Sequence, residues 1–98
     1  MPNHTPTIDP LFKALADPTR RSVVAQLSLG PAAVSDLAGA YDMALPSFLQ
    51  HLKVLESSGL VRSSKQGRVR TFTLEPRRLR DAEDWLATQR AIWEQRLD

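Results

Sequence analysis

The sequence has no cysteine among its 98 residues, and no run of apolar residues long enough to span a membrane. The absence of cysteine excludes disulfide bonds and thiolate metal sites. A membrane helix needs about 18 or more consecutive apolar residues, and the N-terminal stretch MPNHTPTIDP lacks the basic and apolar regions of a signal peptide. We therefore expect a protein of a reducing compartment, the cytoplasm, with no membrane partner.

The groups that usually perform catalysis are missing as well. The sequence contains no nucleophile paired with a base, no glycine-rich phosphate loop, no cluster of metal ligands and no pair of carboxylates in an apolar setting. Its two histidines, His4 and His51, lie far apart along the chain. We predict that the protein is not an enzyme, and we predict no catalytic residue, no metal-binding residue and no cofactor.

What the sequence does contain fits one globular domain. Hydrophobic residues make up 42% and charged residues 24% of the chain, which are ordinary values for a soluble domain of this size. The opening residues 1–9, with Pro2 and Pro6, are expected to form a flexible N-terminal arm. Residues 10–98 are expected to form a single folded domain.

Positive charge is concentrated in the middle of the chain, although the net charge is only +2. Residues 1–43 carry three basic and four acidic side chains, residues 44–80 carry eight and two, and residues 81–98 carry two and five. Such a concentration is the footprint of a nucleic-acid-binding surface. A solvated basic face would look the same, so charge alone leaves both interpretations open.

Four helices are expected in the first 57 residues. The first begins at Pro10, and Asp17-Pro18 is typical of the N-cap and first position of a second helix. The stretch AAVSDLAGAYD indicates a third helix. Residues 44–57 predict a fourth, because apolar side chains recur there at spacings of three and four, at Leu45, Phe48, Leu52 and Leu55.

A β-hairpin and a long helix complete the chain. The segments LVRSS and RVRTFTL, joined by Lys65-Gln66-Gly67, predict a hairpin over residues 61–74. The helix over residues 77–97 carries more large apolar groups than one small protomer can cover, so some should meet another chain. The fold class is therefore mostly α with a small β-hairpin (α+β), in the order of a winged helix-turn-helix with N- and C-terminal dimerisation helices.

Three stretches together resemble the ArsR-type winged-helix transcriptional repressors: LADPTRRSVVAQL, HLKVLESSGLVRSSKQGRVRTFTL and DWLATQRAIWEQRLD. The resemblance covers nearly everything from Pro10 onward. It implies a homodimeric repressor that binds double-stranded operator DNA and releases it when an effector binds; the sequence does not name that effector. The chain departs from the metal-sensing members, because AAVSDLA stands where cysteines would be needed and the last helix has no histidine.

The fourth helix is the expected recognition helix, since in this fold its first turns enter the major groove. Gln50 can form two hydrogen bonds with adenine, and Lys53 can reach phosphate or guanine. Leu49 has two interpretations: packing against a neighbouring helix, which base rates of burial favour, or contact with a thymine methyl. The groove-facing candidates are Pro46, Ser47, Leu49, Gln50 and Lys53, and for each the alternative is an ordinary exposed helix residue.

The hairpin is the expected wing. Its basic residues Lys65, Arg68 and Arg70 are uninterrupted by acid and are predicted to contact the DNA backbone or a narrow minor groove. The alternative is a charged edge that prevents strand aggregation. For the remaining arginines, Arg20, Arg21, Arg77, Arg78 and Arg80, phosphate contacts and pairing with acidic neighbours stay open.

The first and last helices are the expected dimer interface. The two tryptophans of the last helix fit core or dimer contacts better than a ligand box. His51 fits a packed, hydrogen-bonded histidine better than a metal ligand. A winged helix that serves only protein association is the alternative function, although it would not need the basic hairpin. The predicted interface residues are Leu11, Phe12, Leu15, Leu79, Leu86, Ile92 and Trp93.

Overall fold

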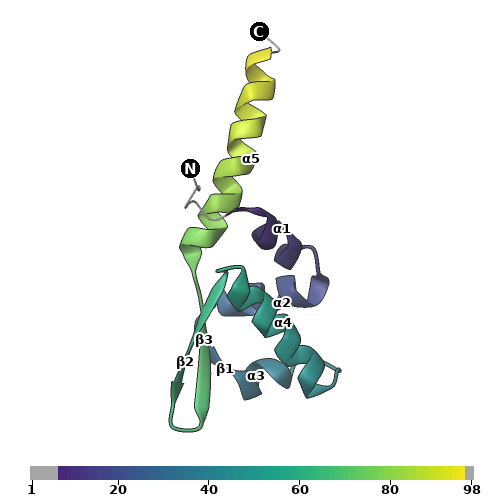
Figure 1. The fold of residues 1–98 in the computed structure, drawn as a ribbon, viewed down its shortest axis with the longest axis vertical. Helices are drawn as coiled ribbons and strands as arrows, with labels where there is room; N and C mark the ends of the chain where they lie inside the picture. The colour runs from purple at the N-terminus through teal and green to yellow at the C-terminus, as the bar shows by residue number, and fades with distance from the viewer. Residues whose placement is uncertain (1–6, 97–98) are drawn as a thin grey trace, which may run out of the picture.

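The computed structural model describes residues 7–96 (Figure 1). The predicted arm and the last residue of the predicted final helix thus fall mostly outside the described part. Helix α1 begins at Asp9, one residue before the expected start of the domain. The elements in chain order are α1 Asp9–Leu15, α2 Pro18–Leu27, β1 Ala32–Ala33, α3 Val34–Ala38, α4 Leu45–Ser57, β2 Val61–Gln66, β3 Val69–Leu74 and α5 Pro76–Arg96.

Helix α2 begins as the sequence predicts. The Oδ2 atom of Asp17 accepts a hydrogen bond from the backbone N–H of Arg20 at 2.9 Å, and Pro18 occupies the first turn. This bond lowers the pKa of the Asp17 carboxyl; partial desolvation opposes the shift, and the charges of His51 and Arg20 reinforce it. The cap therefore fixes the start of α2 through an ionised carboxylate.

Helix α4 ends in a Schellman motif, in which a left-handed residue reverses the chain. Gly59 has a φ of +84°, the backbone N–H of Leu60 bonds the carbonyl of Leu55 at 3.1 Å, and the N–H of Gly59 bonds the carbonyl of Glu56 at 3.1 Å. Only glycine adopts this φ without strain. The turn directs the chain straight from α4 into β2.

The hairpin is part of a three-stranded antiparallel sheet in the order β1-β3-β2. The pairing of β2 with β3 runs from Val61 opposite Leu74 to Gln66 opposite Val69. Gly67 and Arg68 are therefore left as a two-residue turn, and Gly67 has a φ of +62°. The sequence predicted the turn at Lys65-Gln66-Gly67, but Lys65 and Gln66 belong to β2. The prediction also missed β1, whose two alanines pair with Thr71 and Phe72.

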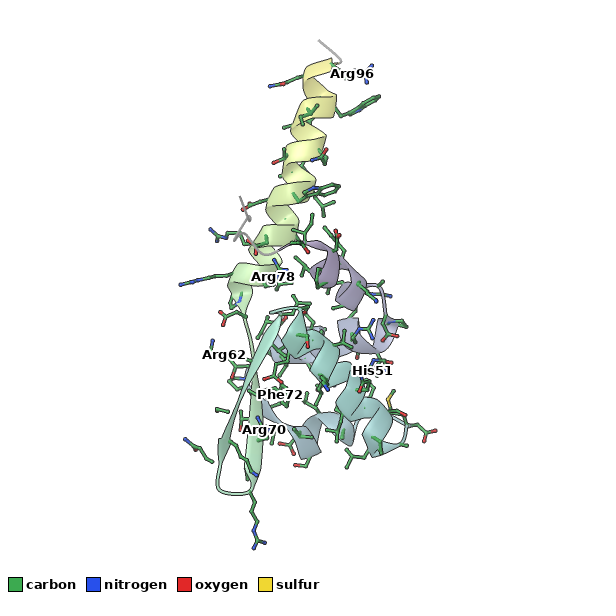
Figure 2. All side chains as sticks on the ribbon, in the orientation of Figure 1. His51, Arg62, Arg70, Phe72, Arg78 and Arg96 are labelled. Carbon is green, nitrogen blue, oxygen red and sulfur yellow. The ribbon has the colours of Figure 1, made fainter. Side chains whose placement is uncertain are left out.

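One core holds α1 to α4 and the sheet together. Its largest fully buried side chains come from every helix of this part and from the start of β2, and Phe72 of β3 points into it (Figure 2). Leu11 lies in this core with no exposed surface, so its prediction as a dimer contact is wrong: it packs within its own protomer. The largest fully buried side chains of the core are Phe48, Leu11, Leu37, Leu52, Leu55, Leu60 and Val23.

Helix α5 projects from the rest of the molecule and gives it an elongated shape, 56 × 33 × 22 Å (Figure 1). The wing points to the opposite end of the long axis. Only the first turns of α5 bury side chains, and all residues from 83 to 96 are exposed. Within residues 7–96, no helix is both long and apolar enough to cross a membrane.

Candidate nucleic-acid interface

Helix α4 has two faces of different character. Phe48, Leu52 and Leu55 are buried against the core, as their spacing predicts. The other side of the helix is exposed and carries polar and charged groups among apolar ones. The predicted groove-facing residues all lie on this exposed side: Pro46, Ser47, Leu49, Gln50 and Lys53.

Leu49 is exposed in the protomer. Its side chain is 43% exposed and lies outside the hydrophobic core and the partly buried residues around it. This exposure favours the alternative, in which the leucine is available to a partner. The neighbouring stripe of Phe48, Leu52 and Leu55 is the part of α4 that lies in the core.

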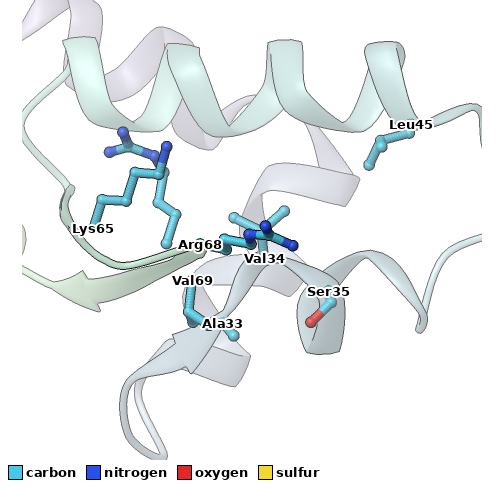
Figure 3. Close-up of a pocket in the computed structure, with 8 residues that line it drawn as sticks. Ala33, Val34, Ser35, Leu45, Lys65, Arg68 and Val69 are labelled. Atoms are coloured by element: carbon cyan, nitrogen blue, oxygen red, sulfur yellow. The ribbon is translucent and has the colours of Figure 1, made fainter.

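A basic cleft of about 460 Å³ lies between the wing and the start of α3 and α4 (Figure 3). Lys65, Arg68 and Arg70 provide its charge, and Ser35 adds a hydroxyl group from the first turn of α3. None of its lining residues is acidic. They are Ala33, Val34, Ser35, Leu45, Lys65, Arg68, Val69 and Arg70. The structure thus brings all three predicted wing residues beside the N-terminal end of α4.

Two of these cations face each other directly across the hairpin. Lys65 pairs with Arg70 in the β2–β3 register, so both side chains leave the same face of the sheet. That face is the one that Phe72 turns toward the core. Like charges directly opposite in a β-ladder are unfavourable, and an anion between them would remove the repulsion.

Arg70 has a partial counterweight inside the protein. Its Nη1 donates to the Ser63 hydroxyl at 2.8 Å, and that hydroxyl donates to the Glu56 carboxylate at 2.8 Å. These two hydrogen bonds orient the guanidinium of Arg70 from β3 toward α4, although Arg70 does not form a direct ion pair with Glu56. Arg70 is therefore held in place and remains available to an anion in the cleft.

Several other arginines are already occupied. Arg62 forms a 2.9 Å ion pair with Glu75 across the hairpin. Arg20 donates to the carbonyls of Ala14 and Lys13, and Arg21 to that of Leu15. These carbonyls end helix α1, where cationic donors are favourable. The sequence had proposed phosphates or acidic groups as partners and missed these carbonyls.

His51 lies between α4 and the start of α2, as predicted (Figure 2). Its Nδ1 is 3.1 Å from Nη1 of Arg20 and 3.8 Å from Oδ2 of Asp17. The arginine can only donate, so Nδ1 of His51 is the acceptor in this contact. Among residues 7–96, no group of three or more histidine or acidic side chains is placed to hold a metal ion.

Gln50 and Lys53 line a second, smaller hollow of about 230 Å³ between α4 and α1. Lys13 of α1 lies on its other wall. The position of this lysine beside α4 could not be predicted from the sequence, because a single cation on a short helix has no distinctive pattern. It places a further positive charge beside the predicted recognition helix.

The apolar side chains of α5 form a separate surface. Trp85 and Ile92, seven residues apart, form one stripe along the helix. Leu86 and Trp93, also seven residues apart, form the neighbouring stripe. Each of these four side chains is about half exposed. Phe12 of α1 packs edge-on against Trp85, with 5.8 Å between ring centroids. Phe12, Leu15 and Leu79 are partly buried against the core, so of the predicted interface the α5 residues are the most exposed.

Known proteins of similar sequence share both the domain and the fold. Residues 15–64 match the family described as helix-turn-helix domain. A solved structure of an ArsR family transcriptional regulator, RHA00566, is 54% identical and superposes with a TM-score of 0.87, over 89% of this chain and 96% of that one.

Two bacterial regulators are also similar. The HTH-type transcriptional regulator Rv2034 of Mycobacterium tuberculosis is 43% identical over 68 residues, 69% of this chain and 64% of the relative. The arsenical resistance operon repressor of Escherichia coli is 45% identical over 67 residues, 67% of this chain and 57% of the relative. The match thus spans less than two thirds of either relative. With the solved regulator matched over nearly its whole length, the chain belongs to the ArsR family of winged helix-turn-helix transcriptional regulators.

Proposed function

We propose that the protein is a homodimeric repressor that binds a specific operator in double-stranded DNA. Helix α4 enters the major groove, and the wing, residues 61–74, follows the flanking backbone or minor groove. The observation that carries this proposal is the basic cleft, in which Lys65 and Arg70 face each other and, among the described residues, neither forms a direct ion pair with an acidic side chain. A DNA phosphate is the group that best relieves this repulsion.

The exposed side of α4 supplies base recognition in this proposal. Gln50 presents an amide that matches adenine N6 and N7, and Ser47 contacts a base or a phosphate. Lys53 reaches phosphate or guanine, and Leu49 meets a thymine methyl, since its side chain is exposed. Pro46 fills the first turn, where no backbone N–H is needed within the helix.

A second copy of the chain covers α5 in this proposal. Four large side chains half exposed on one side of a projecting helix are costly in water, and a two-fold dimer buries them against the same surface of the partner. Two recognition helices then meet successive major grooves about 34 to 36 Å apart. The interface consists of Leu86, Ile92 and Trp93, with Trp85, and with Phe12, Leu15 and Leu79 at its margin.

The remaining roles follow from the same proposal. The protein acts in the cytoplasm, catalyses no reaction and needs no cofactor to fold. An effector that loosens DNA binding is expected for a repressor of this family. Because the sequence contains no cysteine, thiolates of this chain cannot hold such an effector, and we propose a small molecule bound by other groups.

The proposal is tested by the affinity for duplex DNA at increasing salt. Each phosphate contact releases counterions, so log affinity should fall steeply and linearly with log salt. Selection of bound fragments from genomic DNA then supplies the operator and its half-site spacing. No binding at low salt would contradict the proposal and favour the alternative of a protein-association module.

The wing is tested by Arg68→Ala. We expect weaker binding to all sequences and a salt slope reduced by about one, because one phosphate contact is lost. Arg62→Ala is the matched control on the same hairpin, since its guanidinium already pairs with Glu75 away from the tip. Equal effects of the two substitutions would contradict a special role for the tip.

A further inference from the structure

Arg78 is buried at the junction of three parts of the molecule, although it stands in a run of arginines that suggests a surface position (Figure 2). Its side chain extends from the first turns of α5 across the end of α4 and toward the residue before α1. Only 9% of its surface is exposed. It therefore contributes nothing to the basic surface, and its charge must be satisfied inside the protein.

Three acceptors from three segments satisfy it. Nε donates to the carbonyl of Ser58 at 2.7 Å, Nη1 donates to Oδ2 of Asp81 at 3.1 Å, and Nη2 donates to the carbonyl of Thr7. Ser58 is the C-cap of α4, Asp81 lies on α5, and Thr7 precedes α1. A planar guanidinium holds such acceptors at fixed angles.

The end of α4 is shaped to receive this side chain. Gly59 follows the C-cap, and a Cβ atom built there would lie 3.4 Å from Nε of Arg78 and 3.5 Å from its Cδ. The arginine thus lies flat against the backbone of the Schellman turn. The partial negative charge of the last carbonyls of α4 favours a cation at this point.

Besides Arg78, Ala82 of α5 lies in the hydrophobic core and Leu79 packs against it. A single residue, Glu75, links β3 to α5, and α1 is the helix that packs against α5. We propose that Arg78 is a positioning residue for DNA recognition: it sets the angle between α4 and the helices α1 and α5. In a dimer formed through α5, this angle decides how far apart the two copies of α4 lie.

This inference rests on the proposed function and makes a separate prediction. A change at Arg78 should alter which half-site spacing the dimer accepts, whereas one α4 should still recognise one half-site. Loss of general stability would weaken every DNA complex alike. The spacing profile therefore distinguishes a positioning role from a merely structural one.

The experiment measures affinity for duplexes that carry the two selected half-sites with spacers shortened or lengthened by one and two base pairs. A single half-site duplex and a random duplex of equal length accompany them. For Arg78→Gln we expect about a tenfold loss at the natural spacing, comparable to a mismatched base pair, a broader spacing profile and an unchanged affinity for the single half-site. Arg78→Lys should behave in the same way, since one ammonium cannot bridge three acceptors.

Arg80→Gln is the matched control. It removes the same charge from an exposed position two residues further along, on the opposite side of α5, so it should lower the affinity for all duplexes equally and leave the profile sharp. Should Arg78→Gln fail to fold by thermal unfolding, Asp81→Ala takes its place, because it removes one bond to Arg78 from a half-exposed position, and the same broadening is expected.

A folded variant whose spacing profile superimposes on that of the wild type and of Arg80→Gln would overturn the inference while leaving the proposed function intact. A wild-type protein that binds none of the duplexes would instead contradict the proposed function.

Discussion

Two regions of the molecule expose side chains of opposite kinds. The wing with α4 exposes charged side chains, and the projecting part of α5 exposes apolar ones. The wing presents Lys65, Arg68 and Arg70, whereas α5 presents Trp85, Leu86, Ile92 and Trp93. The charges follow the same division, since residues 44–80 carry eight basic and two acidic side chains and residues 81–98 carry two and five.

The difference indicates what can cover each surface. Water solvates the cations of the wing well, and a polyanion competes for them with a strong dependence on salt. Water solvates the apolar stripe of α5 poorly, and a second apolar surface removes that cost with little dependence on salt. Under the proposed function, one small chain therefore separates its two partners by the physics of the contact: nucleic acid at one end and its own copy at the other.

The largest expected effect lies on α5. Trp93→Ala should weaken dimerisation by about 2 kcal/mol or more, because a half-exposed tryptophan in an apolar stripe is typical of an interface hot spot. Sedimentation equilibrium at micromolar concentration measures it. Asp84→Ala, on the opposite side of the helix, is the control and should leave the dimer intact. An unchanged mass for both variants would remove α5 from the interface.

The next effect lies on α4. Gln50→Ala should cost about 1 to 3 kcal/mol on the selected operator and little on random DNA, since it removes two hydrogen bonds to one base. Fluorescence anisotropy with both duplexes measures the difference. Equal losses on operator and random DNA would show that this residue does not read bases.

The start of α2 gives a smaller effect. Asp17→Ala should lower the free energy of unfolding by about 1 kcal/mol through loss of the N-cap. Because the pKa of this carboxyl is lowered in the folded protein, its contribution is present above the ordinary pKa of aspartate and is lost as the pH falls through the lowered value.

Asp17→Asn is the control for that pH dependence. Asparagine can still cap the helix but does not titrate in this range. The free energy of unfolding of this variant, measured with urea from pH 5 down to a pH roughly two to three units lower, should therefore change less with pH than that of the wild type. An equally steep loss of stability in the asparagine variant would show that other carboxylates cause it.

The smallest effect on stability is expected at Leu49. Leu49→Ser should change the free energy of unfolding by less than about 0.5 kcal/mol, because the side chain is exposed. Base preference should change at one position of the selected operator if the leucine meets a thymine methyl. Clear destabilisation in thermal unfolding would return it to a packing role.

The sequence predicted the elements that local chemistry determines. Asp17-Pro18 marks the start of α2 and the apolar spacing marks the buried side of α4, and both lie where they were expected. These signals act within a few residues of the chain. They place helix α4 and the two strands of the hairpin close to their observed positions in the sequence.

The sequence could not predict features that depend on distant partners. Strand β1 consists of two alanines that pair only because the free edge of β3 comes beside them. Leu11 looks like an interface residue until α2 and α4 cover it, and Arg78 looks like a surface cation until three carbonyl and carboxylate oxygens surround it. The exposure of the Leu49 side chain likewise depends on which residues of other elements lie beside it in the folded protein.

The two-residue turn at the tip of the wing has a consequence for the entropy of DNA binding. Because the ladder continues to Gln66 opposite Val69, Arg68 is carried on backbone that is already ordered. A disordered basic tail loses about 1 to 2 kcal/mol of backbone freedom for each residue that it fixes on DNA. The wing has lost that freedom during folding, so on binding the tip has only the rotamers of its side chains left to lose.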